Sequence, residues 1–165
     1  MKNRIFIGEF IGSAFLVMII VGSGIMAQNL TRDFAVMLLA NTLATGAGLF
    51  VLINSIASIS GAHFNPVVTM VMYFTKRIKK DLIFIIFSSL KKGSTSVAAS
   101  VATYITAGYW FTSSTSFANP AVALARTFTD TFTGISYLNT PSYIVAEIIG
   151  ALLALFVIKK IISKK

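Results

Sequence analysis

Two asparagine-proline pairs are the residues of this chain best suited to bind a small solute. They are Asn65-Pro66 and Asn119-Pro120, the second followed by Ala121, and each lies between long apolar stretches. An asparagine amide offers two N–H donors and one oxygen acceptor, so in apolar surroundings it can hold a polar molecule by hydrogen bonds without any covalent step. The pairs therefore indicate recognition of a neutral polar solute.

Each pair also predicts the start of a helix. The asparagine side chain can accept from unpaired backbone N–H groups, and a proline at the first helical position loses no needed donor. About ten residues follow each pair before a charged or polar segment, too few to cross a bilayer. We therefore predict two re-entrant half-helices, over about 66–75 and 120–128. Val68 of the first corresponds to Val122 of the second, which indicates an internal duplication.

The composition is that of an all-α integral membrane protein. The chain has 165 residues, of which 56% are hydrophobic, and its mean hydropathy is +0.83, too apolar for a soluble domain of this size. The net charge of +9 would suit a nucleic-acid partner. However, the basic residues cluster beside apolar segments, which favours membrane topology over nucleic-acid binding.

The same counts argue against catalysis. There is one histidine, there are five acidic residues on separate segments, and there is no cysteine. These residues supply neither a catalytic constellation nor the ligand spacing of a metal or nucleotide site. We expect no enzyme activity, no metal and no cofactor.

Four segments are apolar and long enough, or nearly so, to cross a bilayer. They cover about residues 5–27, 34–57, 94–113 and 141–158. Tyr109 and Trp110, near the end of the third segment, fit an interfacial aromatic belt. The helices that these segments form must hold the two half-helices in position within the membrane.

The domain organisation follows from these segments. We predict one membrane domain over 1–165, with a first half-repeat at 1–75 and a second at 97–165. The connector at 76–96 contains an apolar run of nine residues, 82–90, between lysine clusters. Such a run should lie at the cytoplasmic interface of the membrane and not cross it.

The positions of lysine and arginine predict the topology. Placing the N-terminus in the cytoplasm puts nearly all basic residues there, and the C-terminus with them, as membrane proteins favour. The first half-helix then enters from the cytoplasm and the second from the opposite side. Their starts, each with unpaired N–H groups, would meet near the bilayer midplane. Such an arrangement opposes protons and cations and admits small neutral solutes.

The sequence around both pairs resembles the major intrinsic protein family, the aquaporins and aquaglyceroporins. The family's first motif is matched by Ser60-Gly61-Ala62-His63-Phe64-Asn65-Pro66, and its second by Thr112 to Arg126. Its first helix is similar to Gly8-Glu9-Phe10 with Gly12. The run from Tyr109 to Val122 is most like a bacterial branch associated with uncharged solutes and metalloid acids. The resemblance covers nearly the whole chain and implies a passive channel in the cell (inner) membrane.

The chain also departs from this family. Family members have six spanning helices in two inverted halves, but here the two asparagines are 54 positions apart and one spanning segment lies between them where three belong. We expect an aquaporin-like bundle reduced to about four transmembrane helices plus two half-helices, without the third and fourth helices. The fourth helix lines the family's channel, so one wall would face lipid unless another subunit fills it. Homotetramers are usual in the family, and a homo-oligomer is expected.

The resemblance also implies a constriction of four residues. Carried over by spacing from the two asparagines, these are Thr45, Ala107, Ser116 and Val122. Water-selective members have an aromatic residue, a histidine and an arginine among these positions, and Val122 stands where the arginine would be. Small and apolar residues imply a wider, less polar passage, suited to glycerol, urea or undissociated metalloid acid.

Four titratable residues, Glu9, His63, Arg126 and Glu147, lie close to the two motifs or within apolar segments. Glu9 resembles a family glutamate that accepts hydrogen bonds from the re-entrant loop. His63 either lines the pore mouth or bonds to loop backbone. Arg126 is expected to pair with Asp130 or to bind loop carbonyls, a filter role being less favoured. Glu147 does not match the glutamate of the missing fourth helix and is expected to be a satisfied buried or interfacial carboxyl.

The sequence leaves two other functions open. The chain is alternatively a non-conducting, internally deleted remnant or an accessory subunit, because both motifs are intact while a wall is missing. A second alternative is a small proton-coupled four-helix exporter that uses Glu9. The strong cytoplasmic bias of basic residues and the paired half-helices argue against the exporter.

Overall fold

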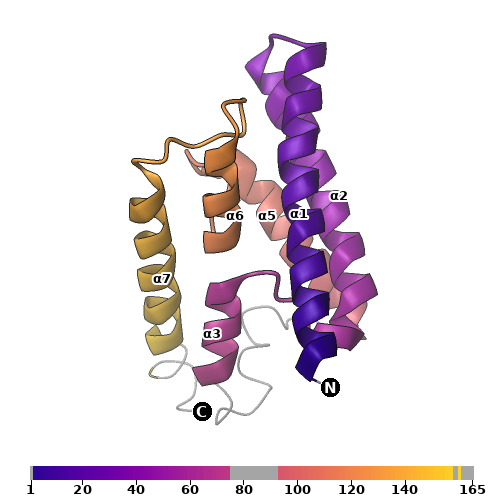
Figure 1. Ribbon diagram of the computed structural model, residues 1–165, viewed down its shortest axis with the longest axis vertical. Coiled ribbons are helices and arrows are strands. Elements are labelled where there is room, and N and C mark those ends of the chain that lie inside the picture. Colours follow the sequence, from indigo (N-terminus) through magenta and orange to yellow (C-terminus); the bar gives the residue numbers. More distant parts are fainter. Residues whose placement is uncertain (1, 75–92, 158–159, 161–165) are drawn as a thin grey trace.

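The computed structural model describes residues 2–74, 93–157 and 160. The described residues form helices joined by loops, with no strand among them. The predicted interfacial run at 82–90, and the connector at 76–96 up to residue 92, lie outside the described residues. Helix labels follow Figure 1.

Two long antiparallel helices form one side of the bundle. Helix α1 covers Lys2–Leu30 and helix α2 covers Phe34–Ser60, so both extend beyond their predicted spans. Asp33 caps α2, because its carboxylate accepts from the backbone N–H groups of Ala35 at 2.8 Å and Val36 at 3.2 Å. The α1–α2 turn marks the end of the bundle that we call the distal end (Figure 1).

Helix α5, Gly93–Phe111, packs against α2 (Figure 1). The close approach depends on Gly46, where any side chain would overlap the hydroxyl of Thr106. Small residues at such contacts let helix backbones approach where no hydrophobic driving force acts between helices.

Two short helices begin at the prolines of the Asn-Pro pairs. Helix α3 covers Pro66–Phe74. Helix α6 covers Pro120–Ala125 and tightens into a 3₁₀ turn, η1, at Arg126–Phe128. The last helix, α7, covers Thr140–Val157. Figure 1 shows α3 and α6 end to end, with α7 on one side and the α1–α2 pair on the other.

Three of the described helices are long and apolar enough to cross a membrane: α1, α2 and α7. Helix α5 covers most of the predicted segment 94–113 but is not among them. Its 19 residues include many serines, threonines and glycines, which lower its hydropathy. The composition of α5 therefore does not support its prediction as the fourth spanning helix.

A small apolar core joins the long helices to the two half-helices. Its buried members are Leu16, Ile20, Leu49, Ile53, Ala62, Phe64, Ala98 and Val122. The ring of Phe64 is only 1% exposed and lies directly against Gly12 of α1, where a Cβ would overlap it. Phe64 precedes Asn65, so this contact fixes the start of α3 against α1.

We expect Gly12→Ala to destabilise the protein by about 1–3 kcal/mol, because the added methyl group overpacks a filled contact. Gly22 is the matched control on the same helix, since a Cβ there meets nothing within 4 Å. Gly22→Ala should leave stability unchanged or raise it by up to about 1 kcal/mol through helix propensity. Thermal unfolding in detergent measures both, and equal midpoints for the two variants would contradict the packing argument.

Candidate functional site

The candidate site lies where the two short helices start. The Oδ1 atom of Asn65 accepts from the backbone N–H groups of Val67 at 2.9 Å and Val68 at 3.4 Å. The Oδ1 atom of Asn119 accepts from the N–H of Ala121 at 3.1 Å. Each asparagine therefore caps its own helix and satisfies donors that have no intrahelical partner.

The two asparagines also join the half-helices to each other. Nδ2 of Asn65 donates to the carbonyl of Ala118 at 2.6 Å, and Nδ2 of Asn119 donates to the carbonyl of Phe64 at 2.7 Å. Ala118 and Phe64 are the residues immediately before the two asparagines, so the bonds are reciprocal. Each Nδ2 carries two hydrogens and each asparagine is partly exposed. One hydrogen of each amide is thus not used in these bonds.

Glu9 on α1 holds the loop that leads into α3. Its Oε1 accepts from the hydroxyl of Ser60 at 2.6 Å and from the N–H of His63 at 3.1 Å. Its Oε2 accepts from the N–H of Phe64 at 2.6 Å. These bonds stabilise a loop in which Ala62 and Phe64 have positive φ angles of 51° and 47°, a conformation that is costly for such residues. A carboxylate engaged in three bonds is suited to support this loop.

Glu147 on α7 has a similar position at the other half-helix. Its Oε1 accepts from the N–H of Asn119 at 3.0 Å. Its Oε2 is buried and has no partner among the described residues. The expectation of a satisfied buried or interfacial carboxyl therefore holds for one of its two oxygens. Sequence reasoning missed its contact with the second motif, although a carboxyl inside an apolar helix signals a specific partner.

His63 bonds through its ring to the first half-helix. Its Nδ1 lies 3.0 Å from the hydroxyl oxygen of Thr69 on α3, so the ring partner is a side chain and not the loop backbone. The backbone N–H of His63 is the group that Glu9 binds. His63 thus links the loop to the helix that follows it.

The four positions assigned to the constriction have different surroundings. Thr45 is 1% exposed and its hydroxyl lies 3.1 Å from the Tyr109 hydroxyl. Ser116 packs against Gly108, and Val122 belongs to the apolar core. Ala107 is exposed on α5.

The residue that α5 presents to Thr45 is therefore Tyr109. It is 3% exposed, so its assignment to an interfacial belt is wrong, whereas Trp110 is exposed. The available signal was helical spacing, because Tyr109 lies seven residues after the buried Ala102 and so on the same face of the helix.

Arg126 binds loop groups. Its Nε donates to the carbonyl of Thr133, and its Nη2 donates to the hydroxyl of Thr115 at 2.9 Å. Its guanidinium carbon lies 4.2 Å from the ring centre of Phe117. The structure has no ion pair between Arg126 and Asp130, so the loop-carbonyl expectation is the one confirmed.

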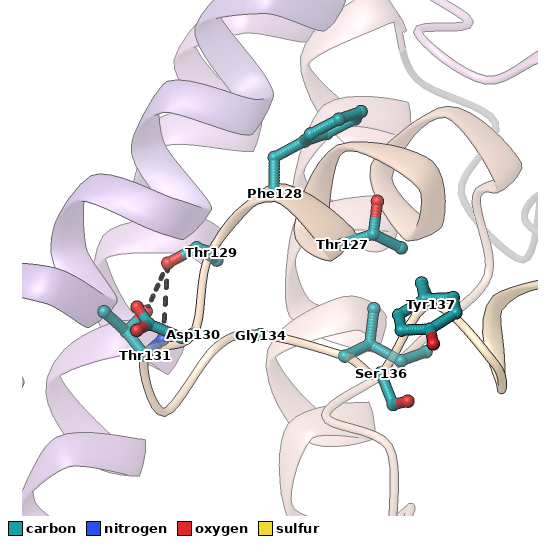
Figure 2. Close-up of a pocket in the computed structure, with 9 residues that line it drawn as sticks. Thr127, Phe128, Thr129, Asp130, Thr131, Gly134, Ser136 and Tyr137 are labelled. Atoms are coloured by element: carbon teal, nitrogen blue, oxygen red, sulfur yellow. Dashed lines mark hydrogen bonds between the residues drawn. The ribbon is translucent and has the colours of Figure 1, made fainter.

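A pocket opens at the distal end, beyond η1 (Figure 2). It is lined by the loop from Thr127 to Tyr137, with Thr129 bonded to Thr131 and with Asp130 as its carboxylate. The loop is tied to α1 by a bond of 2.7 Å from the N–H of Phe132 to Oε1 of Gln28. The pocket contains none of the sequence-predicted site residues.

Comparison with known proteins gives a consistent result. The family model described as "Major intrinsic protein" matches residues 1–106. The chain is 37% identical to "Aquaglyceroporin AqpS" of Rhizobium meliloti over 200 aligned positions, which cover 90% of this chain and 86% of that protein. It is 36% identical to "Probable aquaporin TIP5-1" of Oryza sativa subsp. japonica over 108 positions, covering 64% of this chain and 40% of that protein. No solved structure gives a significant match.

The family match covers more than half of the chain, and the bacterial relative aligns with nearly all of it. Together with three membrane-length apolar helices, these matches identify a multi-pass membrane protein of a family of solute channels. The chain belongs to the major intrinsic protein family.

Proposed function

We propose that this protein is a passive channel for small uncharged solutes, with glycerol, urea and undissociated metalloid acid preferred over strict water selectivity. The observation that carries the proposal is the reciprocal pairing of Asn65 and Asn119, which leaves one amide N–H of each free at the meeting point of the half-helices. A hydroxyl or carbonyl oxygen of the solute would accept from these donors. The name of the bacterial relative, an aquaglyceroporin, supports the same solute class.

The backbone between the helices supports a channel as well. Non-helical backbone at membrane depth is tolerated only where it is buried in protein or lines a water-filled cavity. The loops before Asn65 and Asn119 are non-helical, and their inner residues bond to each other through the asparagines. In our proposal their remaining polar groups line the passage.

The proposed constriction consists of Thr45, Ala107, Ser116 and Val122, with Tyr109 supporting Thr45. None of the four carries a charge, and Val122 in particular offers no hydrogen bond. A passage bounded by these side chains discriminates mainly by size and only weakly by polarity, which favours solutes larger than water.

The two intramembrane carboxylates fit a supporting role. Glu9 receives two bonds from the first loop and one from Ser60 at the end of α2, and Glu147 receives one from the start of the second half-helix. A proton-coupled exporter needs a carboxylate that binds a proton and the substrate in turn, whereas both oxygens of Glu9 accept hydrogen bonds from Ser60 and the loop that follows it. We therefore assign both residues to positioning.

The wall of the channel is proposed to be completed by another copy of the chain. Helix α7 packs against α3 and α6 (Figure 1), and the third and fourth helices of the family pattern are missing from our assignment. The alignment with the bacterial relative spans 200 positions, more than this chain has, so part of the relative has no counterpart here. We propose a homo-oligomer, of tetrameric form by analogy with the family, in a bacterial inner membrane with both termini cytoplasmic.

The decisive experiment is stopped-flow light scattering on proteoliposomes under osmotic gradients of glycerol and urea. We expect the wild-type chain to equilibrate faster than empty liposomes. The double variant Asn65→Ala/Asn119→Ala should lose this excess, because it removes both the solute donors and the helix caps.

Asn54→Ala serves as the matched control, since Asn54 donates to the Phe50 carbonyl of its own helix. It should conduct like the wild type. Rates equal to those of empty liposomes for folded wild-type protein would refute the channel and identify a non-conducting remnant.

Val122→Arg should reduce glycerol permeation about tenfold, which corresponds to a barrier increase of about 1.4 kcal/mol, and should affect water much less. The reason is that a guanidinium added at the constriction narrows it for the larger solute. Val122→Leu, which adds volume without charge or donors, is the control. Unchanged glycerol flux in Val122→Arg would remove this residue from the constriction.

Glu147→Ala should lower stability by about 1–3 kcal/mol, because the N–H of Asn119 loses its acceptor in the interior, and should reduce solute flux with it. Glu147→Gln keeps an oxygen acceptor and should retain most of both. Thermal unfolding and stopped-flow scattering on the same samples test this. If Gln proved as harmful as Ala, the negative charge and not the hydrogen bond would be the property required.

A further inference from the structure

Arg126 is a buried charged residue to which the proposed function assigns no role. It is 3% exposed and begins the 3₁₀ turn that follows α6. An arginine keeps its positive charge at any physiological pH. Burial of such a charge costs free energy unless the charge is paired and hydrogen-bonded. A buried charge in a membrane protein is therefore a candidate for a functional role.

The groups around the guanidinium are neutral. It donates to a backbone carbonyl, that of Thr133, and to a hydroxyl, that of Thr115, and it lies over the aromatic ring of Phe117. No salt bridge involves Arg126 within the part of the chain that the structure describes. These partners satisfy its hydrogen bonds and offset part of the desolvation cost. They do not cancel its charge.

This charge lies beside the proposed constriction. Val122 precedes Arg126 by four residues, one helical turn along the same side. Thr115 and Phe117, which contact the guanidinium, are the immediate neighbours of Ser116. Of the four constriction positions, Ser116 therefore lies between two residues that contact Arg126. Val122 lies one helical turn before Arg126 itself.

We propose that Arg126 determines the charge selectivity of this channel. Its uncompensated positive charge, held in the wall beside the constriction, repels cations including hydronium, while the side chain stays out of the passage and leaves it wide enough for glycerol. The inference rests on the proposed channel function. In this proposal Arg126 adds a fixed positive charge beside a constriction that has no charged member, and reinforces the opposition to cations expected from the half-helix starts.

A purely structural role makes a different prediction. Arg126 also joins two loops, one through Thr115 and the other through Thr133. If this clamp were its whole contribution, a change that keeps the clamp would have no effect on ion leakage. If charge is the property that matters, cancelling the charge without breaking the clamp must let cations through.

The matched pair Thr115→Asp and Thr115→Asn separates these roles. Thr115 has a φ of 56°, which both aspartate and asparagine tolerate. Aspartate places a carboxylate where Nη2 of Arg126 already donates, so it neutralises the guanidinium and tightens the contact. Asparagine has the same shape without the charge.

Proteoliposomes containing a pH-sensitive or a sodium-sensitive dye report ion leakage, and light scattering on the same vesicles reports glycerol flux. We expect Thr115→Asp to raise proton and sodium leakage on the order of tenfold, as removal of a nearby unit charge in a partly polar interior implies. Its glycerol flux should stay within about twofold of wild type. Thr115→Asn should match the wild type in both measurements.

A second pair makes the test independent of Thr115. Arg126→Gln should leak cations as Thr115→Asp does, and Arg126→Lys should restore exclusion. Equal cation leakage from Thr115→Asp and Thr115→Asn would overturn the proposal, and so would equal leakage from Arg126→Gln and Arg126→Lys. If glycerol still passes in these variants, the proposed channel function is unaffected. Absence of glycerol flux in the wild type would overturn the proposed function and this inference with it.

Discussion

The structure depends on the pair of hydrogen bonds that joins the two half-helices start to start. Nine- and six-residue helices are too short to be stable alone, because the cost of nucleating a helix is recovered only over longer stretches. Asn65 and Asn119 solve this by capping their own helices with the oxygen and binding the opposite loop with the nitrogen. Neither half-helix can move along its axis without breaking the contacts of the other.

The two halves are supported unequally. Glu9 holds the first loop through two hydrogen bonds and the adjoining end of α2 through a third, and Phe64 packs against Gly12. The start of the second half-helix receives one carboxylate bond, from Glu147, and the loop before it is held by Arg126. Support for the second half therefore comes from later in the chain, from η1 and α7. A duplicated motif need not keep duplicated support, provided that each buried donor finds an acceptor.

Local signals predicted the parts of the fold that local physics determines. Asn-Pro caps fixed the starts of α3 and α6 to the residue, and apolar runs located α1, α2 and α7, because capping and hydropathy are read within a few residues of the chain. The partners of Tyr109 and Glu147 were not predictable in this way. Each depends on the rotation of a helix about its axis. The place of Tyr109 near the end of its segment predicts an interfacial position, but its hydroxyl bonds to Thr45, 64 residues earlier.

The position of α7 against the second motif depends on a few specific contacts and not on extensive burial. It is the least buried of the three membrane-length helices, and lipid gives helices no hydrophobic reason to associate. Its identified ties to the second motif are Glu147 on the N–H of Asn119 and Tyr143 against the ring of Phe117, with ring centres 4.8 Å apart. Phe117 in turn lies beneath Arg126. The same few groups therefore place the last helix, the second half-helix and the buried charge.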